Sequence, residues 1–350
     1  MAAMISYFIV AMFPGTFFTK YKLLFAMQAT GDNARQDALD QYDAVIALRG
    51  LDKPWYTQFY YWVEGIVRHG RLGFSFNRGE PVLHALVGGQ GPLKWTLIII
   101  GSSVLVGWIV GVPLGVFGAA CYRHPAEVLL SSTIYAISAI PPFTLGLTLF
   151  VLYNMLHPEH WLLPGAWGMV SQEFLHSPLS WAKALSHLHR LSLTWLLVST
   201  PIAVIVSRHL RASLLEVLAQ PFIRTALSKG ASRWRILIKH ALRNALNPLV
   251  SMSGFMLTET IGNSIVASIV LYQPNLGSSL VYYTRVQDQP VLTGILILFS
   301  GMLVIGVLIS DLLLAALDPR IRYNWQSKSR NRGAHLLPRI MEGLTPHAAC

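Results

Sequence analysis

Long apolar runs separated by short polar segments dominate this chain. A helix needs about 20 apolar residues to cross the hydrocarbon core of a bilayer. Five runs meet that length: 95–122, 127–156, the stretch between Arg190 and Arg208, 248–272, and the stretch between Asp288 and Asp311. The pattern therefore predicts an all-α integral membrane protein.

A weaker sixth run lies at the N-terminus, from Met1 to Phe18, with Pro14 and Gly15 near its far end. A cleaved signal peptide is the alternative to a retained span. No basic region precedes Ile5, and no clear small-x-small cleavage site follows the run. We expect residues 1–19 to form a first transmembrane helix, which brings the expected number of spans to six.

Composition supports the membrane class. Charged residues make up 12% of the chain, against about 25% in soluble domains. The net charge of +11 raises the question of nucleic-acid binding, but the charges sit at the ends of apolar runs, where they meet membrane lipid instead. Cys121 and Cys350 are far apart, so we expect neither a disulfide framework nor a metal site.

The distribution of Lys and Arg predicts the orientation of the spans. The loop from Arg208 to Arg243 holds eight Lys/Arg and one acid, Glu216, and six more Lys/Arg follow Asp318. The positive-inside rule places both on the cytoplasmic side. Six spans with both termini cytoplasmic satisfy this. The expected segments are an extracytoplasmic one at 20–93, a permease domain at 94–323 with a basic loop at 208–247, and a disordered cytoplasmic tail at 324–350.

Proline and glycine interrupt the second and third spans, at Pro113 and at Pro141-Pro142. Such breaks are tolerated where neighbouring helices or a water-filled cavity satisfy the freed backbone groups. Two interpretations stay open: ordinary kinks that permit close packing, or helices that line a translocation path.

The basic loop has the pattern of helix, glycine turn, helix. Between Ala212 and Leu227 apolar residues recur on one helix face, at Leu215, Leu218, Phe222 and Ala226. Gly230 follows Lys229, which suits a helix end, and Ser232 is suited to cap the next helix. There, one face is predicted to hold Trp234, Ile238, Ala241, Leu242 and Ala245. A pair of juxtamembrane helices whose arginines meet anionic lipid is the alternative.

The same loop carries a resemblance. The residues are Thr225-Ala226-x-x-Lys229-Gly230-Ala231-Ser232, Ile236-Leu237 and His240-x-Leu242-Arg243-Asn244-Ala245-Leu246-x-Pro248. They resemble the coupling loop of ATP-binding-cassette importer permeases of the dipeptide/oligopeptide/nickel family. Three further stretches agree in order: Gly70-x-Leu72-Gly73-x-Ser75-Phe76, Asp288-x-Pro290-Val291, and Ala316-Leu317-Asp318-Pro319-Arg320.

The resemblance implies a division of labour. This chain would be one of two homologous permease subunits, working with two cytosolic ATP-binding subunits and an extracytoplasmic solute-binding protein. The implied ATPase-coupling residues are Arg224, Thr225, Ala226, Lys229, Gly230, Ala231, Ser232 and Arg235. No phosphate-binding Gly-x4-Gly-Lys-Ser/Thr loop occurs in the sequence. We therefore expect a transport subunit without catalytic residues or cofactor, and the sequence does not name the solute among peptides, nickel chelates and oligosaccharides.

One ionisable residue, Glu259, lies centrally in an apolar run. A charge in mid-bilayer is costly unless it faces a cavity or a partner. We expect a mostly neutral translocation path, with Pro141, Pro142, Glu259 and Asn263 as its candidate residues. The alternative for Glu259 is a structural role between helices. A channel or proton-coupled carrier is the alternative for the whole chain, but that class needs several intramembrane ionisable groups.

Overall fold

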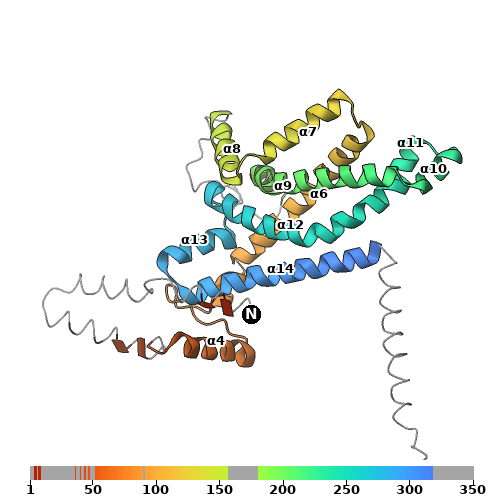
Figure 1. Cartoon of the computed structure of the whole chain (residues 1–350). Helices are drawn as coiled ribbons and strands as arrows, with labels where there is room; N and C mark the ends of the chain where they lie inside the picture. The colour runs from red at the N-terminus through yellow and green to blue at the C-terminus, as the bar shows by residue number, and fades with distance from the viewer. Residues whose placement is uncertain are drawn as a thin grey trace, which may run out of the picture.

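The computed structural model describes residues 52–89, 91–156 and 180–317, together with a few isolated positions before residue 52. Within these residues the chain is helical, apart from connecting turns and an isolated β-bridge between Phe74 and Pro81. Long helices run side by side along the molecule, and shorter helices lie at its two ends (Figure 1).

Four described helices are long and apolar enough to cross a membrane. The candidate spans are Pro92–Ala120 of α6, Leu191–Leu218 of α9, Arg233–Leu271, which includes α12, and Gln289–Ala316 of α14. The pair α7 (Pro125–Ser138) and α8 (Pro142–Leu156) counts as a fifth span if its two bent halves are taken together. The predicted all-helical membrane architecture is confirmed at this level. The expected first span, residues 1–19, lies largely outside the described residues.

The helices α6 (Pro92–Ala120) and α9 (Trp181–Leu218) make the most extensive helix–helix contact among the described residues. Glycines of α6 make room for α9. A Cβ added at Gly107 would lie 2.7 Å from Ile202, one at Gly111 2.8 Å from Val206, and one at Gly115 3.0 Å from Leu210. Bilayer lipid gives little hydrophobic drive for helix association, so membrane helices depend on close packing. Small residues such as these glycines permit that close approach.

In these contacting pairs the residue numbers rise together along both helices. Helices α6 and α9 therefore run in the same direction. The chain must therefore return across the bundle between them, and α7 and α8 lie in that return. The sequence predicts one span at 127–156, whereas the structure has two helices bent by 100°. Pro141 and Pro142 cause the break, because neither has an N–H to donate and each disfavours helix in the residue before it. Pro113, by contrast, lies inside the continuous helix α6.

The helices α12 (Leu242–Leu271) and α14 (Gln289–Leu317) pack antiparallel. Gly254 accommodates Val307, and Gly306 accommodates Leu257. The Ser310 hydroxyl donates to the Val250 carbonyl oxygen at 2.7 Å. This bond joins the C-terminal part of α14 to the N-terminal part of α12.

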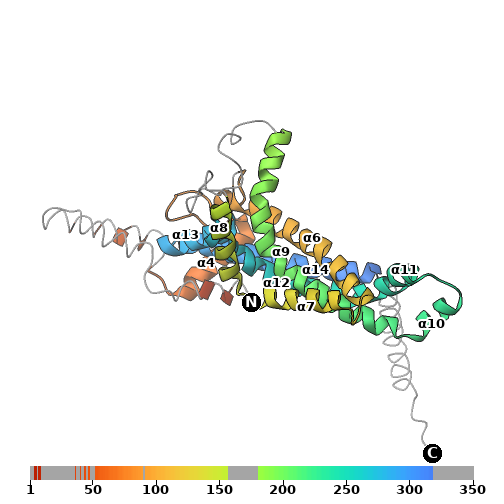
Figure 2. The same ribbon diagram turned by 90° about the horizontal axis from the view of Figure 1, so that it is seen from above.

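Short elements cover the end of the bundle where α6 and α14 begin. They are α4 (Trp55–His69), α5 (Val82–Val87) and α13 (Leu276–Val286). The helices α5, α13 and α14 share a hydrophobic cluster that includes Leu86, Leu276 and Ile295, all fully buried. The helices α10 (Pro221–Ser228) and α11 (Arg233–Arg235) lie at the opposite end, as two perpendicular views show (Figures 1 and 2).

Candidate functional site

The basic loop forms a helix–glycine turn–helix projection at one end of the bundle (Figure 2). Helix α10 ends at Ser228, and Gly230 follows with φ of +78°. The Gly230 N–H donates to the Leu227 carbonyl, and the Ala231 N–H donates to the Ala226 carbonyl. These two bonds and the left-handed glycine form the helix end that glycine favours. The predicted glycine turn is confirmed.

Ser232 begins the second half of the loop. Its hydroxyl accepts a hydrogen bond from the Arg235 N–H at 3.4 Å, so the predicted cap is confirmed, although the bond is long. The short helix α11 continues without interruption through a π-helical segment, η3 (Ile236–Ala241), into α12. The second helix of the loop is therefore continuous with the fifth predicted span.

Two details of the predicted loop are wrong. Helix α9 continues to Leu218, ten residues beyond the expected end of the span at Arg208. The single helix face predicted from 212 to 227 is interrupted between Leu218 and Pro221, where α10 begins. Pro221 causes the break, because the residue before a proline avoids helical geometry. Gln220 accordingly has extended backbone angles.

The predicted face of the second helix is confirmed only in part: Ala241 and Ala245 are fully buried. Trp234 and Ile238 are exposed, whereas Ile236 and Leu237 are buried beside Ala241. The π-helical segment contains more residues per turn than an α-helix, so a face drawn at α-helical spacing does not continue through it.

The loop is anchored by apolar contacts and presents its basic residues outward. Ile223, Ile236 and Leu237 belong to a hydrophobic cluster that also contains Leu210 and Leu214 of α9. The predicted coupling residues are exposed except for Ala226 and Ala231, which are half-buried; the exposed ones are Arg224, Thr225, Lys229, Gly230, Ser232 and Arg235.

Large apolar side chains share the exposed surface of the loop. Phe222 is 44% exposed, Leu227 51% and Trp234 68%. Within the described residues, the loop cations Arg224, Lys229 and Arg235 make no ion pair. Exposed arginine and aromatic side chains are common at protein-docking surfaces.

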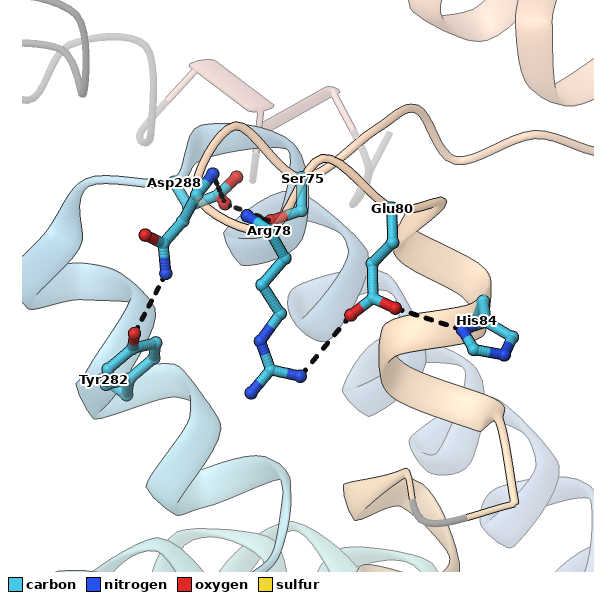
Figure 3. A network of polar contacts seen from close by, with 7 residues as sticks. Ser75, Arg78, Glu80, His84, Tyr282 and Asp288 are labelled. Carbon is cyan, nitrogen blue, oxygen red and sulfur yellow. Dashed lines mark hydrogen bonds and ion pairs between the residues drawn. The ribbon is translucent and has the colours of Figure 1, made fainter.

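A polar clasp closes the opposite end of the molecule (Figure 3). Asp288, at the start of α14, is fully buried. Its Oδ2 accepts a hydrogen bond of 2.6 Å from the Ser75 hydroxyl and one of 2.9 Å from the Asn77 backbone N–H. The Asn77 side chain donates to the Tyr282 hydroxyl at 2.9 Å. The clasp holds the segment before α5 against α13 and α14, and it joins two of the sequence stretches that carried the family resemblance.

A cavity of about 390 Å³ lies beside this clasp. Its lining includes Arg78, Trp95, Ser279 and Tyr282. Arg78 pairs with Glu80 at 3.4 Å, and Glu80 also contacts His84 at 3.2 Å (Figure 3). Burial raises the pKa of the Tyr283 hydroxyl above its ordinary value of 10.0.

The candidate path residues lie on different elements. Pro141 is exposed and Pro142 half-buried at the bend between α7 and α8, whereas Glu259 and Asn263 lie on α12. Glu259 is exposed in the single chain and makes no ion pair or hydrogen bond with a described residue. Helices of this chain therefore do not enclose its carboxylate within the part that the structure describes.

A second cavity, of about 370 Å³, lies among α6, α7 and α9. Its lining is apolar with a few hydroxyls, including Ser199, Thr200 and Ser207, and contains no charged residue. Each of these three hydroxyls donates to a backbone carbonyl of its own helix. The cavity therefore offers neutral walls.

One feature near the basic loop was missed from the sequence. Glu127 is the first residue of the run 127–156, which was treated as apolar throughout, and Arg211 was counted only as one of the loop cations. The Arg211 Nη2 lies 2.7 Å from the Glu127 Oε1. An acid at the start of an apolar run was the available signal, but a linear pattern does not name its partner 84 residues later.

Together these features define a class: a multi-span membrane protein with an exposed basic projection at one end and a polar clasp at the other. The sequence comparisons identify the family. Residues 111–323 match the family described as "Binding-protein-dependent transport system inner membrane component". This chain belongs to that family and is an inner-membrane permease component of a binding-protein-dependent importer of the ATP-binding-cassette type, not an enzyme.

Individual relatives agree with the family. The chain is 34% identical over 307 residues to the glutathione transport system permease protein GsiC of Escherichia coli, covering 86% of this chain and 92% of the relative. It is 31% identical over 275 residues to the oligopeptide transport system permease protein AppB of Bacillus subtilis, covering 78% of this chain and 83% of the relative.

A solved structure supports the fold. An inward-facing structure of the MetNI methionine ABC transporter superposes with a TM-score of 0.52 at 18% identity, covering 67% of this chain and 97% of the matched chain. The helical arrangement is thus that of a known permease. The family implies ATP-hydrolysing and solute-binding partners, and it removes the alternative of a channel or proton-coupled carrier.

Proposed function

We propose that this chain forms half of the translocation pathway of an importer for small peptides. A second homologous permease subunit would complete the pathway, and two cytosolic ATP-binding subunits would drive it. An extracytoplasmic binding protein would deliver the solute. The observation that carries the proposal is the projecting loop around Gly230, which leads directly into α12.

The coupling loop is the proposed docking site for one ATP-binding subunit. Arg224, Lys229 and Arg235 are free to meet acidic groups on that subunit, while Phe222 and Trp234 supply exposed apolar contacts. Residues 208–247 would then be cytoplasmic, as would both termini, in accord with the excess of Lys and Arg.

The proposed pathway is neutral over most of its length. The uncharged cavity among α6, α7 and α9 supports this view. Glu259, with Asn263 one turn further along α12, is proposed to face the pathway or the second permease, because its exposed carboxylate would otherwise meet lipid at a considerable energetic cost. Solute choice would then lie mainly with the binding protein.

Small peptides are the proposed solute class. The support comes from the two relatives above, whose names refer to glutathione and to oligopeptides. A neutral pathway suits solutes whose side chains vary, since the peptide backbone and not a fixed charge is their shared feature.

Uptake into proteoliposomes tests this function. The full complex of both permeases, the ATP-binding subunits and the binding protein is reconstituted, and radiolabelled glutathione or short peptides are added outside with ATP enclosed. Uptake that requires both ATP and the binding protein is expected. ATP-independent uptake, or uptake without the binding protein, would contradict the proposal.

A further inference from the structure

An ion pair joins the bent span to the helix that leads into the coupling loop. The Glu127 side chain is only 4% exposed, and its Oε1 lies 2.7 Å from the Arg211 Nη2. Glu127 stands in the first turn of α7, and Arg211 lies on α9, seven residues before that helix ends at Leu218. Among the described residues Arg211 has no other acidic partner.

The surroundings hold this pair in one geometry. The Ser131 hydroxyl donates to the same Glu127 oxygen at 2.8 Å. The Arg211 guanidinium lies 5.6 Å from the centre of the Tyr122 ring. Gly118 of α6 makes room for the arginine stem, because a Cβ there would lie 3.1 Å from the Arg211 Cδ. The pair therefore sits where α6, α7 and α9 meet.

Helix α7 has little else to hold it in this chain. Glu127 is its one buried residue, although the helix is 14 residues long. Several of its apolar side chains are exposed, with Val128 55% and Leu129 71% exposed. A second cation of α9, Arg208, lies 5.0 Å from the centre of the ring of Tyr135, which belongs to α7. Contacts from α9 arginines are thus the principal polar attachments of α7.

The geometry points to a role in coupling. We propose that the Glu127–Arg211 pair is the mechanical link that passes movement of the coupling loop, through α9, to the bent span α7–α8. This inference rests on the proposed function and assigns Glu127 and Arg211 as positioning residues for transport. The continuous helix α9 carries displacement of the loop to Arg211, and the buried pair makes α7 follow instead of sliding past.

The physical reason is the environment of the pair. Loss of Arg211 leaves the buried Glu127 carboxylate unpaired, which strongly disfavours the original packing. Loss of Glu127 leaves Arg211, whose side chain is 27% exposed, without its acidic partner. Helix α7 would then separate from α9 or adopt several positions, and the wall of the neutral cavity between these helices would no longer move with the loop. ATP hydrolysis would continue while transport declined.

Neutral variants of each residue test the link. Glu127→Gln and Arg211→Gln are placed separately and together in the reconstituted full transporter, and solute imported per ATP hydrolysed is measured. The wild-type complex is measured first, so that absence of ATP-driven uptake there counts against the proposed function and not against the link. Each single variant is expected to lower the ratio about fivefold or more, a size typical of coupling between sites. The double variant is expected to be no worse than the singles, since all three lack the same interaction.

A matched ion pair serves as the control. Arg68 and Glu64 on α4 also lie 2.7 Å apart, but they are more exposed and distant from the loop. Glu64→Gln is expected to leave the import ratio unchanged. An unchanged ratio in assembled complexes carrying Glu127→Gln or Arg211→Gln would overturn the proposal.

A cross-link keeps the test decisive if the neutral variants fail to assemble. Cysteines replace Glu127 and Arg211 in a chain whose Cys121 and Cys350 have become serine, and a short thiol-reactive cross-linker joins them in the membrane. Restoration of the import ratio by the covalent link is expected. A restored assembly with the ratio still low would show that the pair serves stability only and would overturn the proposal.

Discussion

The Ser75 hydroxyl donates a hydrogen bond of 2.6 Å to the Asp288 carboxylate, although 213 residues separate the two in sequence. This bond fastens the segment that precedes the second predicted span to the beginning of the last one. Asp288 is fully buried, and the same oxygen also accepts from the Asn77 N–H. The clasp therefore fixes the cap of the bundle at the end opposite the coupling loop.

Removal of the Asp288 carboxylate should destabilise the protein. Asp288→Ala leaves the Ser75 hydroxyl and the Asn77 N–H without their acceptor, and hydrogen bonds to charged groups contribute about 1.5–3 kcal/mol each. We expect a clear fall in the apparent melting temperature of the detergent-solubilised protein. Asp288→Asn should fall less, because an amide oxygen can still accept both bonds.

Asn77→Ala is the matched control for the clasp. It removes the exposed side-chain bond to Tyr282 but keeps the backbone N–H that donates to Asp288. Its melting temperature should stay near the wild-type value. Equal losses for Asn77→Ala and Asp288→Ala would show that the buried carboxylate is not the centre of the clasp.

Gly230→Val should separate ATP hydrolysis from transport. The left-handed backbone of Gly230 costs roughly 1–2 kcal/mol for a residue with a Cβ, while no atom lies within 4 Å of the place a Cβ would occupy. The substitution therefore distorts the turn without a clash. We expect insertion in the membrane to be normal and uptake per ATP hydrolysed to fall about fivefold or more, in the range of known coupling energies.

A glycine without special backbone geometry provides the comparison. Gly101, within α6, also has no atom within 4 Å of an added Cβ. Gly101→Ala should transport normally. Normal coupling in Gly230→Val would refute a role for the turn.

Glu259→Gln tests the neutral pathway. Glutamine keeps the volume and hydrogen-bonding capacity of the side chain but removes its charge. Uptake of a neutral peptide, with the natural binding protein present, is expected to stay near the wild-type rate, because an uncharged solute does not depend on a charge in the pathway wall. Selective loss of a cationic peptide would instead place solute selection in this chain.

Much of the membrane architecture was predictable from the sequence, because apolar runs of sufficient length have few alternatives in a bilayer. The glycine turn at Gly230 and the cap at Ser232 were predictable too, since each depends on local backbone chemistry. The break before Pro221 carried a usable signal as well: proline disfavours helix at Gln220 whatever lies around it.

Other features depend on contacts between distant segments. Pro141 and Pro142 indicate a break, but packing decides that the bend is 100°. Trp234 and Ala245 do not share a face because the π-helical segment between them shifts the faces that an α-helical period predicts. The partnership of Glu127 with Arg211 arises because α6 and α9 run parallel and bring α7 against both, and no linear pattern records that meeting.

We propose that the loop around Gly230 binds the ATP-binding subunit. Photo-crosslinking in the assembled transporter tests it most directly, with a photoreactive amino acid at Phe222 of the loop or at Tyr60 of α4, two exposed aromatic positions at opposite ends. We expect a cross-link to the ATP-binding subunit from position 222 and none from position 60. Capture of that subunit from position 60, with none from position 222, would contradict it.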